Sequence, residues 1–196
     1  MQNVIKSVIL SACLTGAVTS LAHAADVYDL DQGHTEVIFG WSHAGVSMQH
    51  GEFEKTVGVV TVDPDDLSKT KVEVTIETAS VSTGVEPLDK HLKSADFLQV
   101  DSYPEMTFTS TEVKQTGETT LEITGDLSLH GVTKPVTLNA ELMHKGEHPL
   151  GKILDYYKGD WMGFAATTEI DHMAWGVGSF STGPITIEIN TEMKKR

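Results

Sequence analysis

Alternation of apolar and polar residues on both sides of one short break constrains the fold of this chain more than any other feature. The apolar positions before and after the break are Ile123, Leu127, Leu129, Val136, Leu138, Ala140 and Leu142. Their period of two predicts two half-buried strands. Between the strands, Gly131 is free to adopt a positive φ, and Pro135 is expected where a ladder donor is least needed. The segment therefore predicts a β-hairpin, and nothing at its centre resembles a catalytic group.

Similar alternation recurs along most of the remaining chain. The other segments that carry it are 37–43, 57–62, 72–78, 106–108, 164–170 and 185–191. Turns rich in Gly, Pro and Asp, such as 63–66, separate them. Strands at this spacing predict an all-β fold, either an antiparallel sandwich or a barrel. Closure into a barrel is favoured because it removes the exposed edges of long strands.

One stretch, about residues 87–98, departs from this pattern. Leu88, Leu92 and Ala95 recur there at helical spacing, and Pro87 suits a first helical turn. The stretch predicts a short amphipathic helix among the strands. We expect this helix to plug one end of the barrel or to cover an edge, with its apolar face against the barrel.

Residues 1–24 predict a secretory signal peptide. Lys6 precedes an apolar stretch, 8–18, and a small-x-small cleavage pattern ends at Ala24. The apolar stretch is shorter than the roughly 20 residues that a transmembrane helix needs. Cleavage after this pattern leaves one domain, residues 25–196. An alternative cleavage before Cys13, in a lipobox-like Leu-Ser-Ala-Cys, leaves an unusually short apolar core and is less favoured.

Composition excludes several classes of function. Cys13 is the only cysteine, so the mature domain has no disulfide. In that domain 28 acidic residues outnumber 13 basic ones, because Lys6 is lost, and the net charge is −15. The only arginine is Arg196. Such a surface repels nucleic acid and anionic bilayers, so nucleic acid is not an expected partner.

Six short motifs stand in order along the mature chain. They are D-x-G-H-T-E-V-I-F with His43 (31–43), G-E-F (51–53), S-V-x-T (80–83), D-K-H-L-K-S-A-D-F-L (89–98), Y-P-E-M-T-F (103–108) and G-D-L-S-L-H-G-V-T-K-P-V (125–136). As an ordered set that spans nearly the whole domain, they resemble the YceI-like family of periplasmic polyisoprenoid-binding proteins. The resemblance implies an extended, eight-stranded, antiparallel, lipocalin-like β-barrel around an elongated apolar tunnel. It also implies a periplasmic protein that holds one long isoprenoid lipid, needs no cofactor, and binds or carries rather than catalyses.

Side-chain parity selects the residues that face the inside of such a barrel. The inward candidates are Phe39, Trp41, Val74, Ile76, Phe108, Leu127, Leu129, Leu138 and Ile187. The predicted lipid-binding set also includes His43, Leu92, Phe97, Trp161, Phe164 and Trp175. Transfer of a polyprenyl chain from water into an apolar tunnel is favourable by roughly 25 cal/mol per Å². The alternative is that the same side chains fill a packed core, as they do in many small barrels.

Histidines within the motifs have two interpretations. In the first, His43 or His130 donates a hydrogen bond to a quinone oxygen or a phosphate at the tunnel mouth. In the second, each histidine orders a turn or caps a strand. His144 and His148 have i,i+4 spacing, but the glycine and proline near them argue against the helix that would align two metal ligands. The sequence therefore predicts no metal site.

No catalytic constellation stands out in the sequence. Ser42 and His43 are neighbours on a predicted strand, so they point to opposite faces and cannot form a nucleophile–base pair directly. No G-x-S-x-G elbow occurs. We therefore expect a binding protein rather than an enzyme. Two alternatives remain: a scavenger of fatty acids or fatty amides under stress and, with less support, a metal-dependent enzyme that uses the histidines.

Two departures from the family pattern bear on the head group of the lipid. Family members often carry an arginine before the Gly-Phe pair at 163–164, where this chain has Trp161 and Met162. His172 occupies about the place of a second arginine. Without arginine in the barrel, a pyrophosphate cannot be clamped by paired N–H donors. The expected ligand is an isoprenoid lipid of the quinone or the polyprenyl phosphate type, and the pattern predicts a neutral head, such as that of a quinone, over a prenyl pyrophosphate. Trp161 and Trp175 are candidates for stacking on a quinone ring; the alternative, which is the commoner role of such rings, is structural packing.

Further partners follow from the expected shape alone. An open-ended barrel leaves room for a homodimer and for transient contact with a membrane or a membrane protein. No particular residue indicates either, so the long-chain isoprenoid lipid is the principal expected partner.

Overall fold

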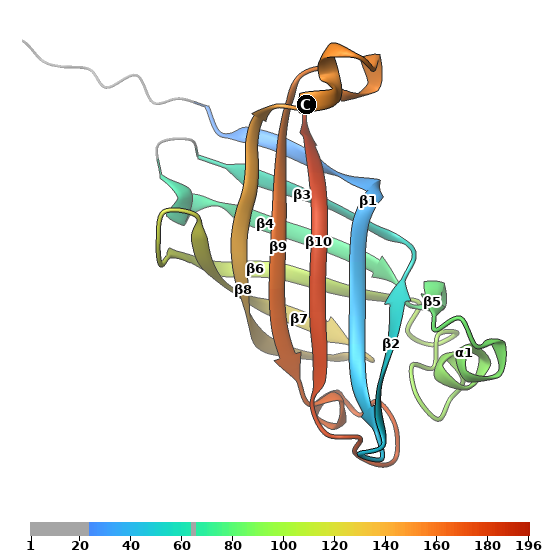
Figure 1. Ribbon diagram of the computed structural model, residues 1–196. Helices are drawn as coiled ribbons and strands as arrows, with labels where there is room; N and C mark the ends of the chain where they lie inside the picture. The colour runs from blue at the N-terminus through green and yellow to red at the C-terminus, as the bar shows by residue number, and fades with distance from the viewer. Residues whose placement is uncertain (1–23, 64–65) are drawn as a thin grey trace, which may run out of the picture.

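The structure is a computed structural model that describes residues 24–63 and 66–196 (Figure 1). The predicted signal peptide, apart from Ala24, and the lipobox-like Cys13 lie outside the described residues. Within the described ranges, no helix is long and apolar enough to cross a membrane.

Ten strands form one antiparallel sheet in the described chain. They are β1 Asp26–His43, β2 Ser47–Phe53, β3 Thr56–Val62, β4 Lys71–Glu77, β5 Val81–Ser82, β6 Glu105–Gln115, β7 Thr120–Leu129, β8 Val132–Glu147, β9 Asp160–Ile170 and β10 Ile185–Lys195. Eight of them make a closed barrel in the order β1-β3-β4-β6-β7-β8-β9-β10, and the pairing of β10 with β1 closes it. β2 adds to β1, and β5 adds to β2, as two extra strands. The predicted eight-stranded barrel is confirmed, and the predicted segments lie in its strands except for Thr78.

β1 changes partners along its length. Residues 26–29 pair with β3, and residues 38–43 pair with β2. Between these two parts, the register with β10 shifts between Leu30 and Thr35. Figure 1 shows that β1 bends sharply, so that β3, β4 and β6 cross β8, β9 and β10 at a steep angle. As a result, β2 takes the place of β3 beside the second part of β1, and β5 extends the sheet beyond β2.

The predicted hairpin consists of β7 and β8. His130 and Gly131 form its turn with positive φ values of 51° and 75°, as a type I′ turn requires. β8 begins at Val132 and runs through Pro135, so the break between the strands is shorter than the sequence indicated. On the side of β7, Pro135 pairs with Asp126 at a position where the two strands exchange no hydrogen bonds. On the other side, β9 pairs with β8 only from Asn139 onward. No neighbouring strand therefore needs the N–H that Pro135 lacks.

The helix α1 spans Glu86–Lys93 and is shorter than the predicted stretch of about residues 87–98. It ends because Ser94 takes an extended conformation with ψ of 174°, and the Ser94 hydroxyl donates to the carbonyl of His91. Leu88 and Leu92 are half-buried toward the barrel as predicted, whereas Ala95 is exposed. The prediction was too long because apolar residues continue at helical spacing beyond Lys93, where the helix ends. α1 lies beside β5, at the edge of the sheet (Figure 1).

Five short 3-10 turns complete the described elements. They are η1 Leu67–Lys69, η2 Thr78–Ser80, η3 Pro149–Lys152, η4 Asp155–Tyr157 and η5 His172–Trp175. η3 and η4 lie between β8 and β9, at the end of the barrel that also holds the C-terminus (Figure 1). η5 lies between β9 and β10 at the opposite end, close to the turn that joins β1 to β2 (Figure 1).

Candidate functional site

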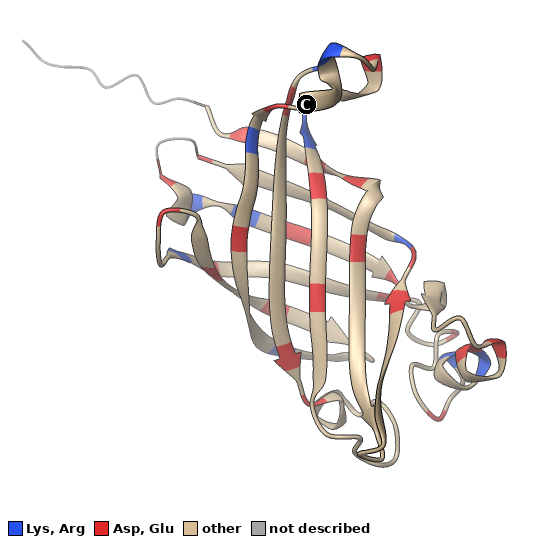
Figure 2. Cartoon of the chain, in the orientation of Figure 1, with Lys and Arg blue, Asp and Glu red and all other residues tan. Residues whose placement is uncertain are grey.

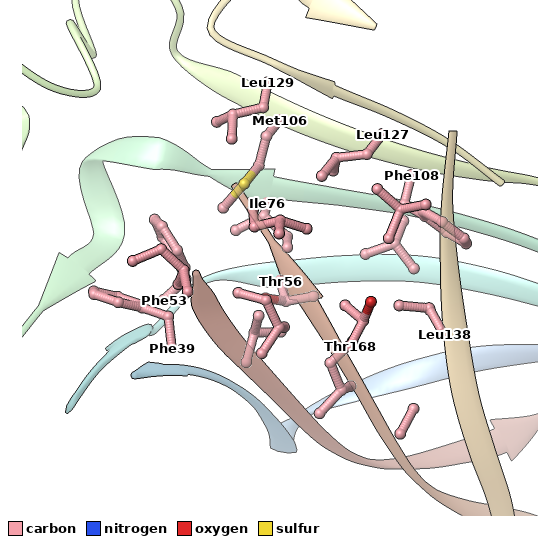
Figure 3. Close-up of a pocket in the computed structure, with 18 of the residues that line it drawn as sticks. Phe39, Phe53, Thr56, Ile76, Met106, Phe108, Leu127, Leu129, Leu138 and Thr168 are labelled. Atoms are coloured by element: carbon pink, nitrogen blue, oxygen red, sulfur yellow. The ribbon is translucent and has the colours of Figure 1, made fainter. Parts of the chain in front are cut away.

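The barrel interior is hollow. A cavity of about 840 Å³ extends through it, within the range of about 300–1,000 Å³ that is usual for pockets that bury a small molecule. All eight barrel strands contribute apolar side chains to the lining. Figure 3 shows side chains such as Ile76, Phe108 and Leu138 around the same space. A fully packed core, the alternative interpretation of the sequence, does not describe this barrel.

Two phenylalanine rings help to keep the cavity open because they lie along its wall. Phe39 covers Gly51 of β2, and Phe108 covers Gly125 of β7. A Cβ atom at either glycine would overlap the ring that covers it. Gly125 thus interrupts the apolar alternation of β7 to make room for the ring from β6.

Most of the predicted lipid-binding residues line this cavity. They are Phe39, Trp41, His43, Val74, Ile76, Leu92, Phe97, Phe108, Leu127, Leu129, Leu138, Phe164 and Ile187. The two exceptions are Trp161 and Trp175. That the lining residues contact a lipid stays a prediction.

Trp161 and Trp175 are buried in other parts of the structure. Trp161 is 1% exposed, precedes the cavity-lining Met162 on β9, and donates from Nε1 to the carbonyl of Tyr157 at 3.0 Å. Successive side chains on a strand face opposite sides, so Trp161 faces the outside of the barrel. Trp175 in η5 donates from Nε1 to the carbonyl of Leu127 at 3.2 Å. Neither ring belongs to the cavity lining, and of the two roles considered for these tryptophans, structural packing fits their contacts.

Thr56, at the start of β3, is a lining residue that the sequence analysis missed. It is 2% exposed, and its Oγ1 has no hydrogen-bond partner among the described residues. A buried polar group without a partner costs about 1–3 kcal/mol. Figure 3 shows Thr56 and Thr168 among the apolar side chains of the cavity. A signal was present in the sequence, since Thr56 shares the inward parity of Val60 and Val62.

Three histidines border the cavity at the end near the turn between β1 and β2. His43 and His91 are exposed and lie at its rim. His172 is buried, and its Nδ1 donates to the carbonyl of Val177 at 2.6 Å. Its Nε2 accepts from the backbone N–H of Thr182 at 3.4 Å. His172 therefore has both ring nitrogens engaged within the protein.

His130 lies outside the cavity lining. In the turn between β7 and β8, its Nδ1 is 3.3 Å from the carbonyl of Trp175. Its ring packs on Tyr103, with centroids 4.4 Å apart. Of the two interpretations of this histidine, the ordering of a turn fits its contacts.

The cavity lining is nearly free of charge. Apart from histidines, Glu118 in the turn between β6 and β7 is the one ionisable residue among the described residues that line it. Figure 2 shows lysine, arginine and carboxylate positions on the barrel strands and on α1, with none on the turn between β1 and β2. A phosphate or carboxylate inside the cavity would therefore find no lysine or arginine partner.

A polar cluster lies outside the cavity, where β1 bends. Nδ1 of His34 is 2.7 Å from a carboxylate oxygen of Asp31, and the Tyr157 hydroxyl is 3.1 Å from Nε2 of His34. One ligand-type atom from each of Asp31, His34 and Glu192 lies within 4.8 Å of the other two. The hydrogen bond to Asp31 raises the pKa of His34. Burial favours the neutral form of Asp31, but hydrogen bonds from His34 and Tyr156 lower its pKa overall.

This cluster connects three parts of the fold. It joins the bend of β1 to Glu192 on β10 and to Tyr157 on η4. The ring of His148 stacks on Tyr157, with centroids 4.3 Å apart, and Nε2 of His148 lies 3.4 Å from Glu192. His144 lies near the end of β8, and His148 is the first residue after that strand. The two histidines are therefore not on a helix, in agreement with the sequence analysis. Since both nitrogens of His34 have protein partners, we interpret the cluster as a structural connection.

The fold and the cavity together define a class of protein: a closed β-barrel that encloses an apolar, ligand-sized space. The chain belongs to the YceI-like family, because the model of the YceI-like domain matches residues 28–194. This match confirms the resemblance that the ordered motifs indicated.

Individual relatives agree with this assignment. Protein YceI of Shigella flexneri is 43% identical over 171 residues, which cover 86% of this chain and 84% of that protein. The structure of BcnA from Burkholderia cenocepacia has a TM-score of 0.72 and 20% identity, and covers 83% of this chain and 98% of its own. A polyisoprenoid binding domain from Saccharophagus degradans has a TM-score of 0.60 and 13% identity, covering 86% and 98% of the two chains. At these identities, the two structures show a shared fold.

Proposed function

We propose that this protein binds a long isoprenoid lipid inside its barrel and carries it in the periplasm. The observation that carries the proposal is the apolar cavity of about 840 Å³ that extends through the barrel. Membership of the YceI-like family and the fold shared with a polyisoprenoid binding domain support it. A polyprenyl tail has a large apolar area, and each square ångström that it buries contributes roughly 25 cal/mol.

The polar groups at the rim of the cavity support binding rather than catalysis. Ser42 and His43 lie side by side there, but the Ser42 hydroxyl accepts a hydrogen bond from the backbone N–H of Gly45 at 3.1 Å. That bond helps to order the turn between β1 and β2. A nucleophile would instead need a base within hydrogen-bond reach.

The lipid of this proposal carries a neutral polar head, such as that of an isoprenoid quinone. Among the described residues that line the cavity there is no lysine or arginine that could pair with a pyrophosphate. Thr56 borders the cavity, and its hydroxyl is buried without a partner among the described residues. Rotation of the Thr56 side chain would turn this hydroxyl toward the cavity, where it can donate to a quinone carbonyl, and such a bond would remove the cost of the unsatisfied group.

Scavenging of fatty amides or fatty acids is the second candidate function. It would use the same cavity for a shorter ligand. Because the described lining holds no lysine or arginine, a carboxylate would be desolvated there without a partner. An amide head fits this class better than an acid does, and the Thr56 hydroxyl can bond it as well as a quinone.

The mass of the bound ligand separates these candidates. Native mass spectrometry of the freshly purified protein should show one bound molecule with the mass of an isoprenoid lipid. After removal of that lipid, an isoprenoid quinone should bind at least about tenfold more tightly than a prenyl pyrophosphate of equal chain length. Tighter binding of the pyrophosphate would contradict the neutral head. A fatty amide mass would favour the scavenger, and uptake of no lipid at all would overturn the carrier.

The substitution Thr56→Val tests the place of the head group. Valine keeps the shape of threonine and removes the unsatisfied hydroxyl, so the delipidated protein should become more stable by about 1 kcal/mol. Quinone affinity should fall about fivefold to tenfold, because one hydrogen bond to the head is lost. Thr168→Val, on another wall of the same cavity, is the matched control. Unchanged quinone affinity in Thr56→Val would place the head elsewhere.

A further inference from the structure

Two uncharged segments meet at one end of the barrel. The chain contains 28 acidic residues, yet residues 37–51 and 172–187 contain no Asp, Glu, Lys or Arg. The first segment includes the turn between β1 and β2, and the second includes η5 and the loop to β10. Gly40 of the first pairs with Thr186 of the second, and both segments border the cavity. We call the turn 41–48 and the loop 176–184 together the uncharged face (Figure 2).

The uncharged face exposes large apolar side chains to water. Val46 is 84% exposed, Met48 is 55% exposed and Phe180 is 58% exposed. The turn that holds Val46 projects past the closed wall, since β10 pairs with β1 only as far as Gly40. Phe180 also borders the cavity, so the apolar tip is continuous with the apolar interior. Clustered exposed apolar side chains mark surfaces that bind another apolar surface.

The turn between β1 and β2 departs from the usual chemistry of such turns. Ala44 and Gly45 both have positive φ, 54° and 75°, and the N–H of Val46 donates to the carbonyl of His43 at 3.0 Å. The first of these two positions favours asparagine or aspartate, because an alanine there crowds its Cβ against the backbone. An apolar residue thus occupies a position where a polar residue would stabilise the turn. Local rules are most often broken where a surface has a function.

We propose that the uncharged face docks on the surface of a lipid bilayer, where lipid passes directly between the membrane and the cavity. This inference rests on the proposed function, because a long isoprenoid lipid cannot cross water without exposing its tail. The acidic remainder of the chain is repelled by anionic lipid head groups. The uncharged face is therefore the side that approaches a bilayer with least repulsion. Insertion of three side chains into the interface gives a brief contact, as a carrier requires.

Paired double variants test this docking. Val46→Glu with Met48→Glu places two carboxylates on the uncharged face, and neither residue lines the cavity. Ile153→Glu with Met143→Glu is the matched control, since these side chains are 78% and 66% exposed near the opposite end of the barrel. Both pairs change the net charge equally. The first readout is flotation of delipidated protein with phosphatidylcholine vesicles. The second is the rate of transfer of an isoprenoid quinone from those vesicles to the protein, with quinone in detergent micelles as the reference.

The expected result is that the wild type and the control float and take up quinone at similar rates. The Val46/Met48 variant should transfer quinone from vesicles at least about tenfold more slowly, because a charged side chain disfavours the membrane interface, and should bind quinone from micelles normally. Equal rates in the two variants would overturn the inference, and so would transfer that needs added membrane protein, which would indicate a protein partner. Binding of no quinone from micelles by the wild type would instead overturn the proposed function, while flotation would still report docking.

Discussion

The two ends of the barrel differ in the contacts that their side chains make. At the end with the chain terminus, acidic and basic groups form close pairs, such as Arg196 with Asp29 and Lys195 with Asp26 at 2.7 Å. The same end holds the cluster around His34, and Trp161 is buried beneath η4. Large apolar side chains are exposed at both ends, such as Ile153 at one and Val46 at the other. The uncharged face differs because no Asp, Glu, Lys or Arg accompanies its apolar side chains, and it borders the cavity.

This difference suggests separate roles for the two ends: one stabilises the barrel, and the other lets a ligand enter and leave. Regions with dense packing and many hydrogen bonds open rarely, whereas regions with few such contacts open at a low cost in free energy. We therefore expect the end near the C-terminus to anchor the barrel, and the uncharged face to open at a lower cost in free energy when a ligand enters or leaves. Three predictions examine this division.

The largest effect is expected from Trp161→Ala. Trp161 is fully buried and its indole N–H has a partner, so its removal should lower the free energy of unfolding by about 3–5 kcal/mol. Quinone affinity of the protein that remains folded should change little, because Trp161 does not line the cavity. Urea unfolding of delipidated protein and quinone titration measure the two quantities.

Trp41→Ala is the matched control at the other end. Trp41 is half-buried, lines the cavity and stacks on Phe39 with centroids 5.8 Å apart. Its removal should cost less stability, about 1–2 kcal/mol, and should weaken quinone binding. If Trp41→Ala destabilised the fold more than Trp161→Ala does, the division between the two ends would not hold.

Most of the barrel was predictable because its strands are half-buried. A strand with one face toward the cavity and one toward water must alternate, as Val72 to Glu77 does. The bend of β1 was not predictable, because it depends on pairing with β3, β10 and β2 in turn, which are distant in the sequence. The two short strands β2 and β5 follow from that bend.

The candidate site was predictable to the extent that parity distinguishes inside from outside. The role predicted for Trp161 did not rest on parity, which places Trp161 and the cavity-lining Phe164 on opposite faces of β9. Both faces of β9 are buried there, since Met162 faces the cavity and Trp161 packs under η4. Thr56 also received no weight in the sequence analysis, because it is a polar residue beside Lys55 at the end of a strand. That its hydroxyl lacks a partner depends on the positions of all its neighbours, which no local pattern contains.

A smaller effect, of opposite sign, is expected at the tip of the uncharged face. Ala44→Asn should raise the free energy of unfolding by about 0.5–1 kcal/mol, because asparagine tolerates the positive φ of this position better than alanine does. Thermal unfolding should show a Tm higher by about 1–4 °C. Gly45→Ala, at the adjacent position with positive φ, should lower Tm and is the control. A lower Tm in Ala44→Asn would mean that the turn does not prefer a polar residue.

The smallest effect concerns pH and belongs to the opposite end. The pKa of His34 is raised in the folded protein, so its pairing with Asp31 contributes fully below the unfolded pKa of about 6.5 and is lost as pH rises through the folded value. The pKa of Asp31 is lowered, so its contribution is present above about 4 and is lost as pH falls. His34 is 43% exposed, and solvent screening limits the pair to less than about 1 kcal/mol.

Between pH 6 and pH 8, Tm of the wild type should therefore fall by about 1–3 °C more than Tm of His34→Gln, which lacks the titrating group. His50→Gln, which replaces an exposed histidine on β2, should follow the wild type. Parallel Tm curves for the wild type and His34→Gln would show that the cluster at the bend of β1 is held by packing of Tyr157 and His148 rather than by charge. The end near the C-terminus would then still anchor the barrel, but its stability would not depend on the protonation of His34.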